Sequence, residues 1–233
     1  GASTDNDRGC SFPQRAAVWM GADVFVQRMG FTVQEKSAQC VRVQYRFGVP
    51  GVPGAQVEMI YTVEAQGALR LDAVYHGVPG APELPCFGIK FETAAPVVRT
   101  RWTGLSGETY PDRCKGGVFG CHEEPPHIEP ALVPQDCGLH MDTQQVNLQL
   151  ADGKTLTLES TGEAFAFSAL PNTAQQIEAA QHPCELPETG RTCVTVLGAA
   201  RGVGGIDSWG TDVEAPYHVN GEQQHSVSLR ILL

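Results

Sequence analysis

One glycine-rich stretch combines the residue types that bind a sugar. It covers residues 202–210 and joins four glycines to Asp207, Ser208 and Trp209. A tryptophan offers a flat apolar face that suits the C–H face of a sugar ring, while an acid and a hydroxyl can orient sugar hydroxyl groups. The alternative is a tryptophan that caps the core with its N–H paired. These residues alone favour that structural role, so both interpretations stay open at this point.

Two further clusters could bind ligands. Residues 4–9 contain Asp5, Asn6 and Asp7, whose oxygens could hold a cation or bracket a sugar, although an Asx-turn is the ordinary alternative. Residues 115–144 contain four prolines and a group of metal-ligand types: His122, Glu123, Glu124 and His127. No helical HExxH spacing occurs there, so a polar surface loop is the favoured interpretation.

Motifs for other chemistries are missing from the sequence. There is no GxSxG nucleophile elbow, no P-loop and no dinucleotide fingerprint. The formal net charge of −10 argues against a nucleic-acid partner, and no run of 18 apolar residues predicts a membrane span. The eight cysteines form no CxxC pair, so we interpret them mostly as small buried residues and free thiols. No secretion signal opens the chain, which favours a cytoplasmic location.

Alternation of apolar and polar residues predicts that strands position these clusters. The hairpin turns are predicted at Gly67 and at Asp152-Gly153, and Gly30 is predicted to mark a bulge. One short helix is predicted over 173–181. This pattern indicates an all-β antiparallel sandwich in one domain, 1–233. The predicted strands are 24–27, 31–35, 40–47, 57–64, 68–76, 87–91, 97–102, 146–150, 155–158, 165–168, 193–197 and 225–232.

Six segments, in order along nearly the whole chain, resemble the C-terminal, small-chain domain of glycoside hydrolase family 2 β-galactosidases. Tyr-Pro-Asp-Arg followed by Gly-Val-Gly-Gly-x-Asp-Ser-Trp is the most specific combination among them. The segments are Thr-Asp-Asn-Asp-Arg-Gly (4–9), Leu-Pro-Cys-Phe-Gly (84–88), Trp-Thr-Gly-Leu (102–105), Tyr-Pro-Asp-Arg (110–113), Phe-Ala-Phe-Ser-Ala-Leu-Pro (165–171) and Gly-Val-Gly-Gly-Ile-Asp-Ser-Trp (202–209).

The resemblance implies a β-supersandwich similar to galactose mutarotase. It also implies that the catalytic glutamates lie in a separate barrel, and that the Mg and Na ligands lie outside this domain. We therefore expect no cofactor here, no hydrolysis by this chain alone, and the large subunit or other domains as partners acting on a galactoside such as lactose. Since the family's domain has earlier strands, we also expect an N-terminally truncated fragment.

The resemblance assigns Trp209 as a stacking platform in the outer sugar subsite, which reverses the weighting from the residues alone. Asp207 and Ser208 are expected to hold the loop beside the substrate, and Gly9 to start a lid edge. Two segments depart from the family, at 106–109 and at 134–140, where His140 stands in place of an arginine. We expect both to face other domains.

Two alternatives remain at this stage. The first is an autonomous enzyme similar to aldose 1-epimerase, whose chemistry needs a general acid and base; its only candidates are His76, His122 and His218. The second is a free-standing carbohydrate-binding module, which would bind galactosides without a partner.

Overall fold

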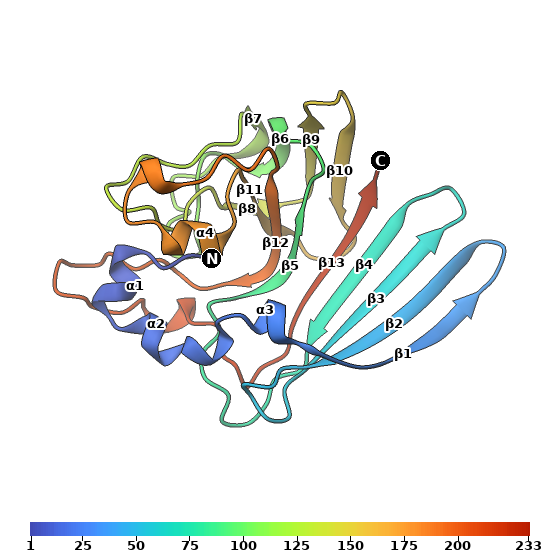
Figure 1. The fold of residues 1–233 in the computed structure, drawn as a ribbon, viewed down its shortest axis with the longest axis horizontal. Helices are drawn as coiled ribbons and strands as arrows, with labels where there is room; N and C mark the ends of the chain where they lie inside the picture. Colours follow the sequence, from blue (N-terminus) through green and yellow to red (C-terminus); the bar gives the residue numbers. More distant parts are fainter.

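Thirteen strands make up most of the regular secondary structure in the computed structural model, which describes residues 1–233 (Figure 1). They are β1 Gln27–Lys36, β2 Cys40–Gly48, β3 Gln56–Glu64, β4 Leu69–Tyr75, β5 Cys86–Glu92, β6 Val97–Leu105, β7 Phe119–Glu124, β8 His140–Thr143, β9 Gln145–Leu150, β10 Thr155–Ser160, β11 Phe165–Leu170, β12 Cys193–Ala200 and β13 His225–Leu232.

The strands form two sheets in which every pair is antiparallel. The larger sheet has the order β1-β2-β3-β4-β13-β10-β9-β6-β7, and the smaller one the order β5-β12-β11-β8. The smaller sheet packs against the middle of the larger one, with β12 against β13 and β8 against β6. The all-β antiparallel sandwich predicted from the sequence is confirmed.

The core lies between the two sheets and follows the period-two pattern of their strands. On β13, Val227 and Leu229 point inward, opposite Phe165 and Phe167 of β11 in the same cluster. β11 is buried on both faces, because Leu170 on its outer side packs with Ile177 of helix α4 (Ala174–Ala179). Burying each such side chain contributes about 1.5–3 kcal/mol to folding.

The local turn predictions are confirmed. Strands β9 and β10 pair across Asp152-Gly153, where Gly153 has φ of 88°. Strands β3 and β4 pair across Gly67, and the register between β1 and β2 shifts beside Gly30. These features depend on short-range backbone preferences, which a sequence shows directly.

Three element predictions are wrong. Besides α4, the chain has α1 (Asp5–Gly9), α2 (Phe12–Arg15) and α3 (Ala22–Phe25), so residues 24–25 are helical rather than extended. Thr4 forms a capping box with Asp7 that starts α1, where a cation site or an Asx-turn was predicted. Residues 115–144 are also not one loop, since they contain β7 and β8.

The remaining helical elements are short. The 3-10 turns are η1 (Ala17–Trp19), η2 (Pro183–Glu185) and η3 (Ala215–Tyr217). The longest helix, α4, has six residues, which is far too few to cross a bilayer. All eight cysteines are free thiols; only Cys137 and Cys193 are buried, so burial is rarer among them than predicted.

We expect Leu229→Ala to lower the free energy of unfolding by about 2–5 kcal/mol, because Leu229 is 0% exposed and its loss leaves a cavity between the sheets. Urea unfolding measures this change. The matched control is Val98→Ala on β6, which is 49% exposed and should change stability by no more than about 0.5 kcal/mol. Equal effects of the two variants would contradict this placement of the core.

Candidate functional site

The loop after β12 carries Trp209 at the surface. Trp209 is 90% exposed, so the interpretation of this residue as a cap on the core is wrong. The loop nevertheless follows a defined path, because Gly204, Gly205 and Gly210 all have positive φ. Side chains from two distant segments hold its backbone.

The Tyr-Pro-Asp-Arg segment binds the start of this loop directly. The carboxylate of Asp112 accepts the N–H of Val203 at 2.9 Å and that of Gly204 at 2.8 Å. The guanidinium of Arg113 donates to the carbonyl oxygen of Gly204. Only 5% of the Asp112 side chain is exposed, and hydrogen bonds to a charged acceptor are about twice as strong as neutral ones. The two most specific sequence motifs therefore hold each other in place.

Helix α1 supplies the second contact. The side-chain amide of Asn6 donates to the carbonyl oxygen of Val203 at 2.9 Å. Gly205 passes close to this amide, since a Cβ atom at position 205 would lie 2.9 Å from Asn6 Nδ2, and its φ is +77°. Only glycine adopts that conformation readily with so little space.

Gly9 lies against the other end of the loop. A Cβ atom at position 210 would lie 2.7 Å from the carbonyl oxygen of Gly9, so the two backbones are in contact beside Trp209. The fold thus brings together Gly9 and Trp209, two site residues 200 positions apart. Whether either one touches a substrate stays a prediction.

Asp207 organises the tip of the loop. Its Oδ1 accepts the N–H of Trp209 at 2.9 Å and that of Thr211 at 3.2 Å, and its Oδ2 accepts the Thr211 hydroxyl at 2.6 Å. These hydrogen bonds, that of the Thr211 hydroxyl first, lower the pKa of Asp207 below its ordinary value. Ser208 is exposed at the same tip.

A buried arginine beyond the motifs anchors the far side of the loop. Arg201 Nη1 lies 2.7 Å from Asp7 Oδ1, its Nε lies 2.7 Å from Glu83 Oε1, and its Nη2 pairs with Asp212. Only 3% of its side chain is exposed, and its guanidinium lies 3.9 Å from the centre of the Phe12 ring. This network joins α1, α2, the segment before β5 and the loop. The sequence analysis did not predict this network, because a single arginine after a predicted strand does not indicate which acidic residues it will contact.

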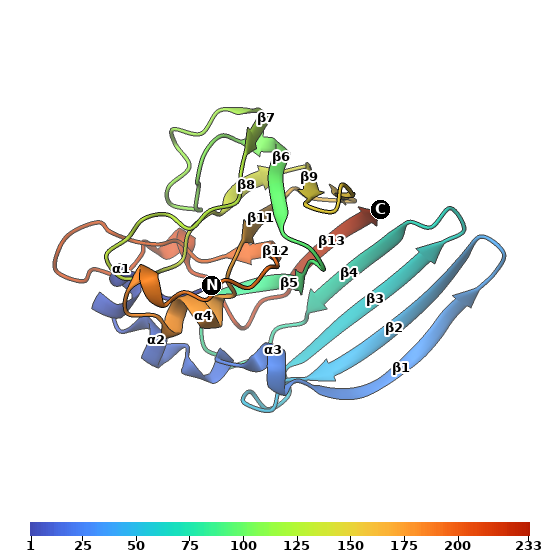
Figure 2. The ribbon, with the colours of Figure 1, turned by 45° about the horizontal axis from the view of Figure 1, so that its top comes forward.

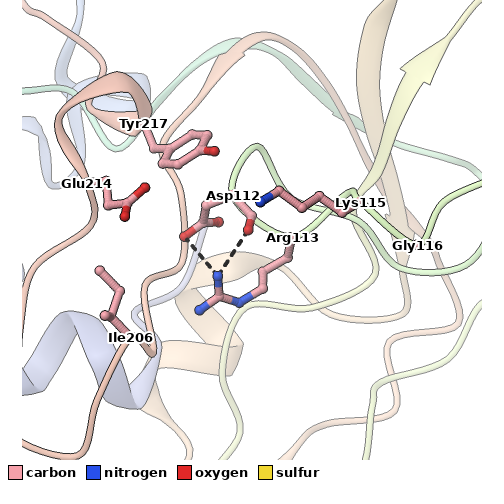
Figure 3. A pocket seen from close by; sticks show the side chains of 7 residues that line it. All are labelled: Asp112, Arg113, Lys115, Gly116, Ile206, Glu214 and Tyr217. Atoms are coloured by element: carbon pink, nitrogen blue, oxygen red, sulfur yellow. Dashed lines mark hydrogen bonds and ion pairs between the residues drawn. The ribbon is translucent and has the colours of Figure 1, made fainter.

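A cavity of about 490 Å³ opens beside the Trp209 loop (Figure 3). Its walls carry side chains of both signs of charge beside the apolar side chain of Ile206. Asp112 and Arg113 are already held by the loop contacts, whereas Lys115 and Glu214 extend from opposite sides (Figure 3). The lining residues are Asp112, Arg113, Lys115, Gly116, Ile206, Glu214 and Tyr217.

The segment at 134–140 faces inward, which corrects the expectation that it faces other domains. Gln135 accepts the N–H of Asp5 at 3.0 Å, and Asp136 accepts the hydroxyl of Tyr110 at 3.2 Å. Burial raises the pKa of Asp136. His140 is 4% exposed, and its ring centre lies 4.2 Å from that of Trp102.

The histidines of the alternative hypotheses are paired locally. His122 Nε2 lies 3.0 Å from the carbonyl oxygen of Val118, and His76 lies 3.4 Å from Glu58. His218 uses both ring nitrogens, with Glu83 at 2.8 Å and the carbonyl oxygen of Val213 at 3.1 Å. No three His, Cys, Asp or Glu side chains gather in a metal-binding arrangement.

Fold and site together define an all-β domain with an exposed tryptophan on a loop that side chains of distant segments hold in place. The chain belongs to the β-galactosidase small chain family, whose sequence model matches residues 2–231. It is 40% identical to the β-galactosidase small subunit of Latilactobacillus sakei, over 99% of this chain and 82% of that protein.

Longer relatives contain this region as one part. The chain is 32% identical to a β-galactosidase of Streptococcus thermophilus over 99% of its own length, but it spans only 23% of that relative. Among solved structures, it is similar to a galactose mutarotase related enzyme from Lactobacillus acidophilus. That match has a TM-score of 0.41 and 9% identity, and covers 86% of this chain and 70% of the other.

We expect Asp112→Ala to lower the free energy of unfolding by about 1.5–3 kcal/mol, because two loop N–H groups lose a charged acceptor. Hydrogen exchange at Val203 and Gly204 should become faster. The control is Asp152→Ala, which also removes a carboxylate from a backbone N–H, that of Lys154 at 3.1 Å, but in an exposed hairpin. Unchanged exchange in the loop would show that Asp112 does not hold it.

The pH dependence of the free energy of unfolding should show the lowered pKa of Asp212. Burial alone would raise the pKa of Asp212, but the hydrogen bond from Arg15 and the charge of Arg201 lower it overall. A carboxyl whose pKa is lowered on folding stabilises the native state above its unfolded pKa of about 3.9, and this stabilisation disappears as the pH falls through the folded pKa.

Asp212→Asn should therefore be less stable than the unchanged chain at pH 6, and the difference should shrink as the pH falls below about 4. Urea unfolding at several pH values measures it. Asp5→Asn is the control, because Asp5 forms an exposed pair with Arg8. A difference that stays constant between pH 6 and pH 3 would refute the assignment.

Proposed function

We propose that this chain forms the C-terminal, small-chain domain of a β-galactosidase, an enzyme that hydrolyses terminal β-D-galactosides such as lactose. In this proposal the chain lends Trp209 to an active site whose catalytic carboxylates lie in a barrel domain of its partner. The observation that carries the proposal is the 90% exposure of an indole on a loop that Asp112, Asn6 and Arg201 hold in place.

The exposure of Trp209 is informative because the loop is fixed. An indole in water stabilises nothing within its own chain, and exposing it forgoes about 1.5–3 kcal/mol of burial available to a large apolar side chain. A braced loop that holds this side chain in solvent is suited to a second surface. A rigid aromatic face adds affinity for a sugar or aglycone at little cost in conformational entropy.

The division of labour follows from the chemistry of retaining glycosidases. They use two carboxyl groups about 5–5.5 Å apart, one as nucleophile and one as acid and base. We assign both to the partner, together with the Mg and Na ligands, and expect this chain alone to be inactive. Asp207 and Ser208 keep the loop tip in shape, and Gly9 is the pivot of a lid edge beside it.

The partner in this proposal is the large subunit, or the other domains of a single-chain enzyme. The small-subunit and full-length relatives support both arrangements. We place the assembly in the cytoplasm, which is compatible with eight free thiols.

Trp209→Ala in the complex with the large subunit should raise KM and lower kcat/KM for lactose about 2- to 10-fold, the equivalent of losing one aromatic contact of about 0.5–1.5 kcal/mol. Trp209→Phe should retain part of the effect. Leu132→Ala is the control, because Leu132 is 88% exposed on a different loop.

Two results would overturn the proposal. One is a Trp209→Ala complex with unchanged KM and kcat/KM. The other is hydrolysis of a galactoside by the purified chain without a partner.

A further inference from the structure

The loop that carries the exposed tryptophan begins and ends on a closed ring of contacts. Arg201, at the start of the loop, pairs through its Nη2 with Asp212 at the end, and its Nε lies 2.7 Å from Glu83 Oε1. His218 closes the ring, since its Nδ1 lies 2.8 Å from the same Glu83 oxygen and its Nε2 lies 3.1 Å from the carbonyl oxygen of Val213. One histidine therefore links both ends of the loop to the body of the domain.

The backbone on either side of His218 keeps it in this position. The carbonyl oxygen of Val219 accepts the N–H of Leu84 at 2.9 Å, and that of Tyr217 accepts the N–H of Gly202 at 3.0 Å. These hydrogen bonds hold His218 between the segment before β5 and the start of the loop. In both ribbon views the loop after β12 lies at the end of the molecule that carries α1 (Figure 1, Figure 2).

Both ring nitrogens of His218 face hydrogen-bond acceptors. The carbonyl oxygen of Val213 can only accept, and Glu83 already accepts the Nε–H of Arg201 at 2.7 Å, so its carboxylate is an acceptor for the imidazole as well. A neutral imidazole has one N–H and one lone pair, whereas the imidazolium has two N–H donors. Either neutral tautomer would point a lone pair at an oxygen, and only the protonated ring donates to both partners.

The charges around this ring balance only when His218 is protonated. The ion pairs join two guanidinium groups and three carboxylates. They are Arg15, Arg201, Asp7, Glu83 and Asp212. The imidazolium of His218 is the third cation, whereas a neutral imidazole leaves one carboxylate in excess. Charges taken out of water are tolerated when each is paired, and only 3% of the Arg201 side chain is exposed.

His218 can exchange its proton with water. Its side chain is 30% exposed, and a cavity of about 520 Å³ opens beside it. Glu83 is the only other titratable residue in the cavity wall; the remaining lining residues are Ala215, Pro216, Asn220, Gly221 and Gln223. Two further titratable groups lie near: Cys10 Sγ is 3.5 Å from Asp212 Oδ1, and Glu214 lines the other cavity (Figure 3).

Loss of the proton opens the ring at one of two places. A neutral imidazole donates either to Glu83 or to the carbonyl oxygen of Val213, and it faces the other with a lone pair. Losing the contact with Glu83 leaves an excess carboxylate beside Arg201, and losing the contact with Val213 releases the end of the loop. Since Trp209 is not buried in its own chain, its position depends on these attachments.

We propose that protonated His218 is a positioning residue for the Trp209 loop, so that the affinity of the sugar subsite falls as the pH rises and the imidazole loses its proton. This inference rests on the proposed function, because that function gives Trp209 a sugar to bind. It adds a regulation of the same site, in which mildly acidic conditions hold the loop and alkaline conditions loosen it.

The first measurement needs no sugar. NMR of the unchanged chain should show both ring nitrogens of His218 protonated at pH 5, the lower end of the range in which histidine usually changes charge. Between pH 5 and pH 8, protection of the Gly202 and Val213 amides from hydrogen exchange, relative to the intrinsic rate, should fall about 10-fold as this proton is lost. His218→Gln is uncharged at every pH and should have the low protection throughout. His76→Gln is the matched control, because His76 pairs with Glu58 of β3 at 3.4 Å.

The second measurement uses the complex with the large subunit. The KM of His218→Gln for lactose should be about 2- to 5-fold that of the unchanged complex at pH 5 and about equal to it at pH 8, since loosening the loop costs no more than losing Trp209. Comparing the two complexes at each pH cancels the titration of the partner's carboxylates. His76→Gln should match the unchanged complex at both pH values.

Three outcomes would overturn the inference: a lone pair on a ring nitrogen of His218 at pH 5, loop protection that is independent of pH, or a KM ratio that is the same at pH 5 and pH 8. Circular dichroism verifies that both variants fold, and the titration of the unchanged chain tests the inference without them. Trp209→Ala separates the two proposals. An unchanged KM in that variant overturns the proposed function and the pH-dependent affinity with it, whereas a raised KM there beside a flat ratio for His218→Gln overturns this inference alone.

Discussion

The ion pairs of the buried Arg201 guanidinium are the interaction on which the rest of the site depends. A charge in a dry environment is costly unless it is fully paired, and here three carboxylates and an aromatic ring surround it. The partners come from α1, from Glu83 and from Asp212, so pairing the charge also fixes the positions of three segments. Removing Arg201 would leave three carboxylates close together without the guanidinium that they share.

This constraint explains how a glycine-rich loop can present a tryptophan without burying it. Arg201 and Asp212 bracket the loop at its ends, while Asp112 and Asn6 hold its backbone near the start. The indole then needs no packing of its own to keep its place. Asp112 and Asn6 bind the main chain of the loop and make no contact that would bury the side chain of Trp209. That side chain therefore stays accessible to another surface.

Local features of the fold could be predicted from the sequence, whereas contacts between distant segments could not. The Asp152-Gly153 turn and the bulge at Gly30 follow from backbone preferences of a few residues. The Arg201 network joins positions up to 194 residues apart, and an arginine carries no sign of which acids it will meet. Helix α1 was missed although Thr4 and Asp7 have capping-box spacing, because the same residues also suit a cation site or a turn.

The two ends of the molecule differ in the amount of apolar surface that they expose. At the Trp209 end, Asp112 and the ion pairs of Arg201 hold the loop, and Ile206 and Trp209 are its exposed large apolar side chains. At the β1 end, hydrogen bonds pair β1 with β2, but β1 and the neighbouring α3 expose several large apolar side chains. Covering the Trp209 end would remove few apolar side chains from water, whereas covering the β1 end would remove many. An apolar surface placed against the molecule would therefore gain more burial at the β1 end than at Trp209.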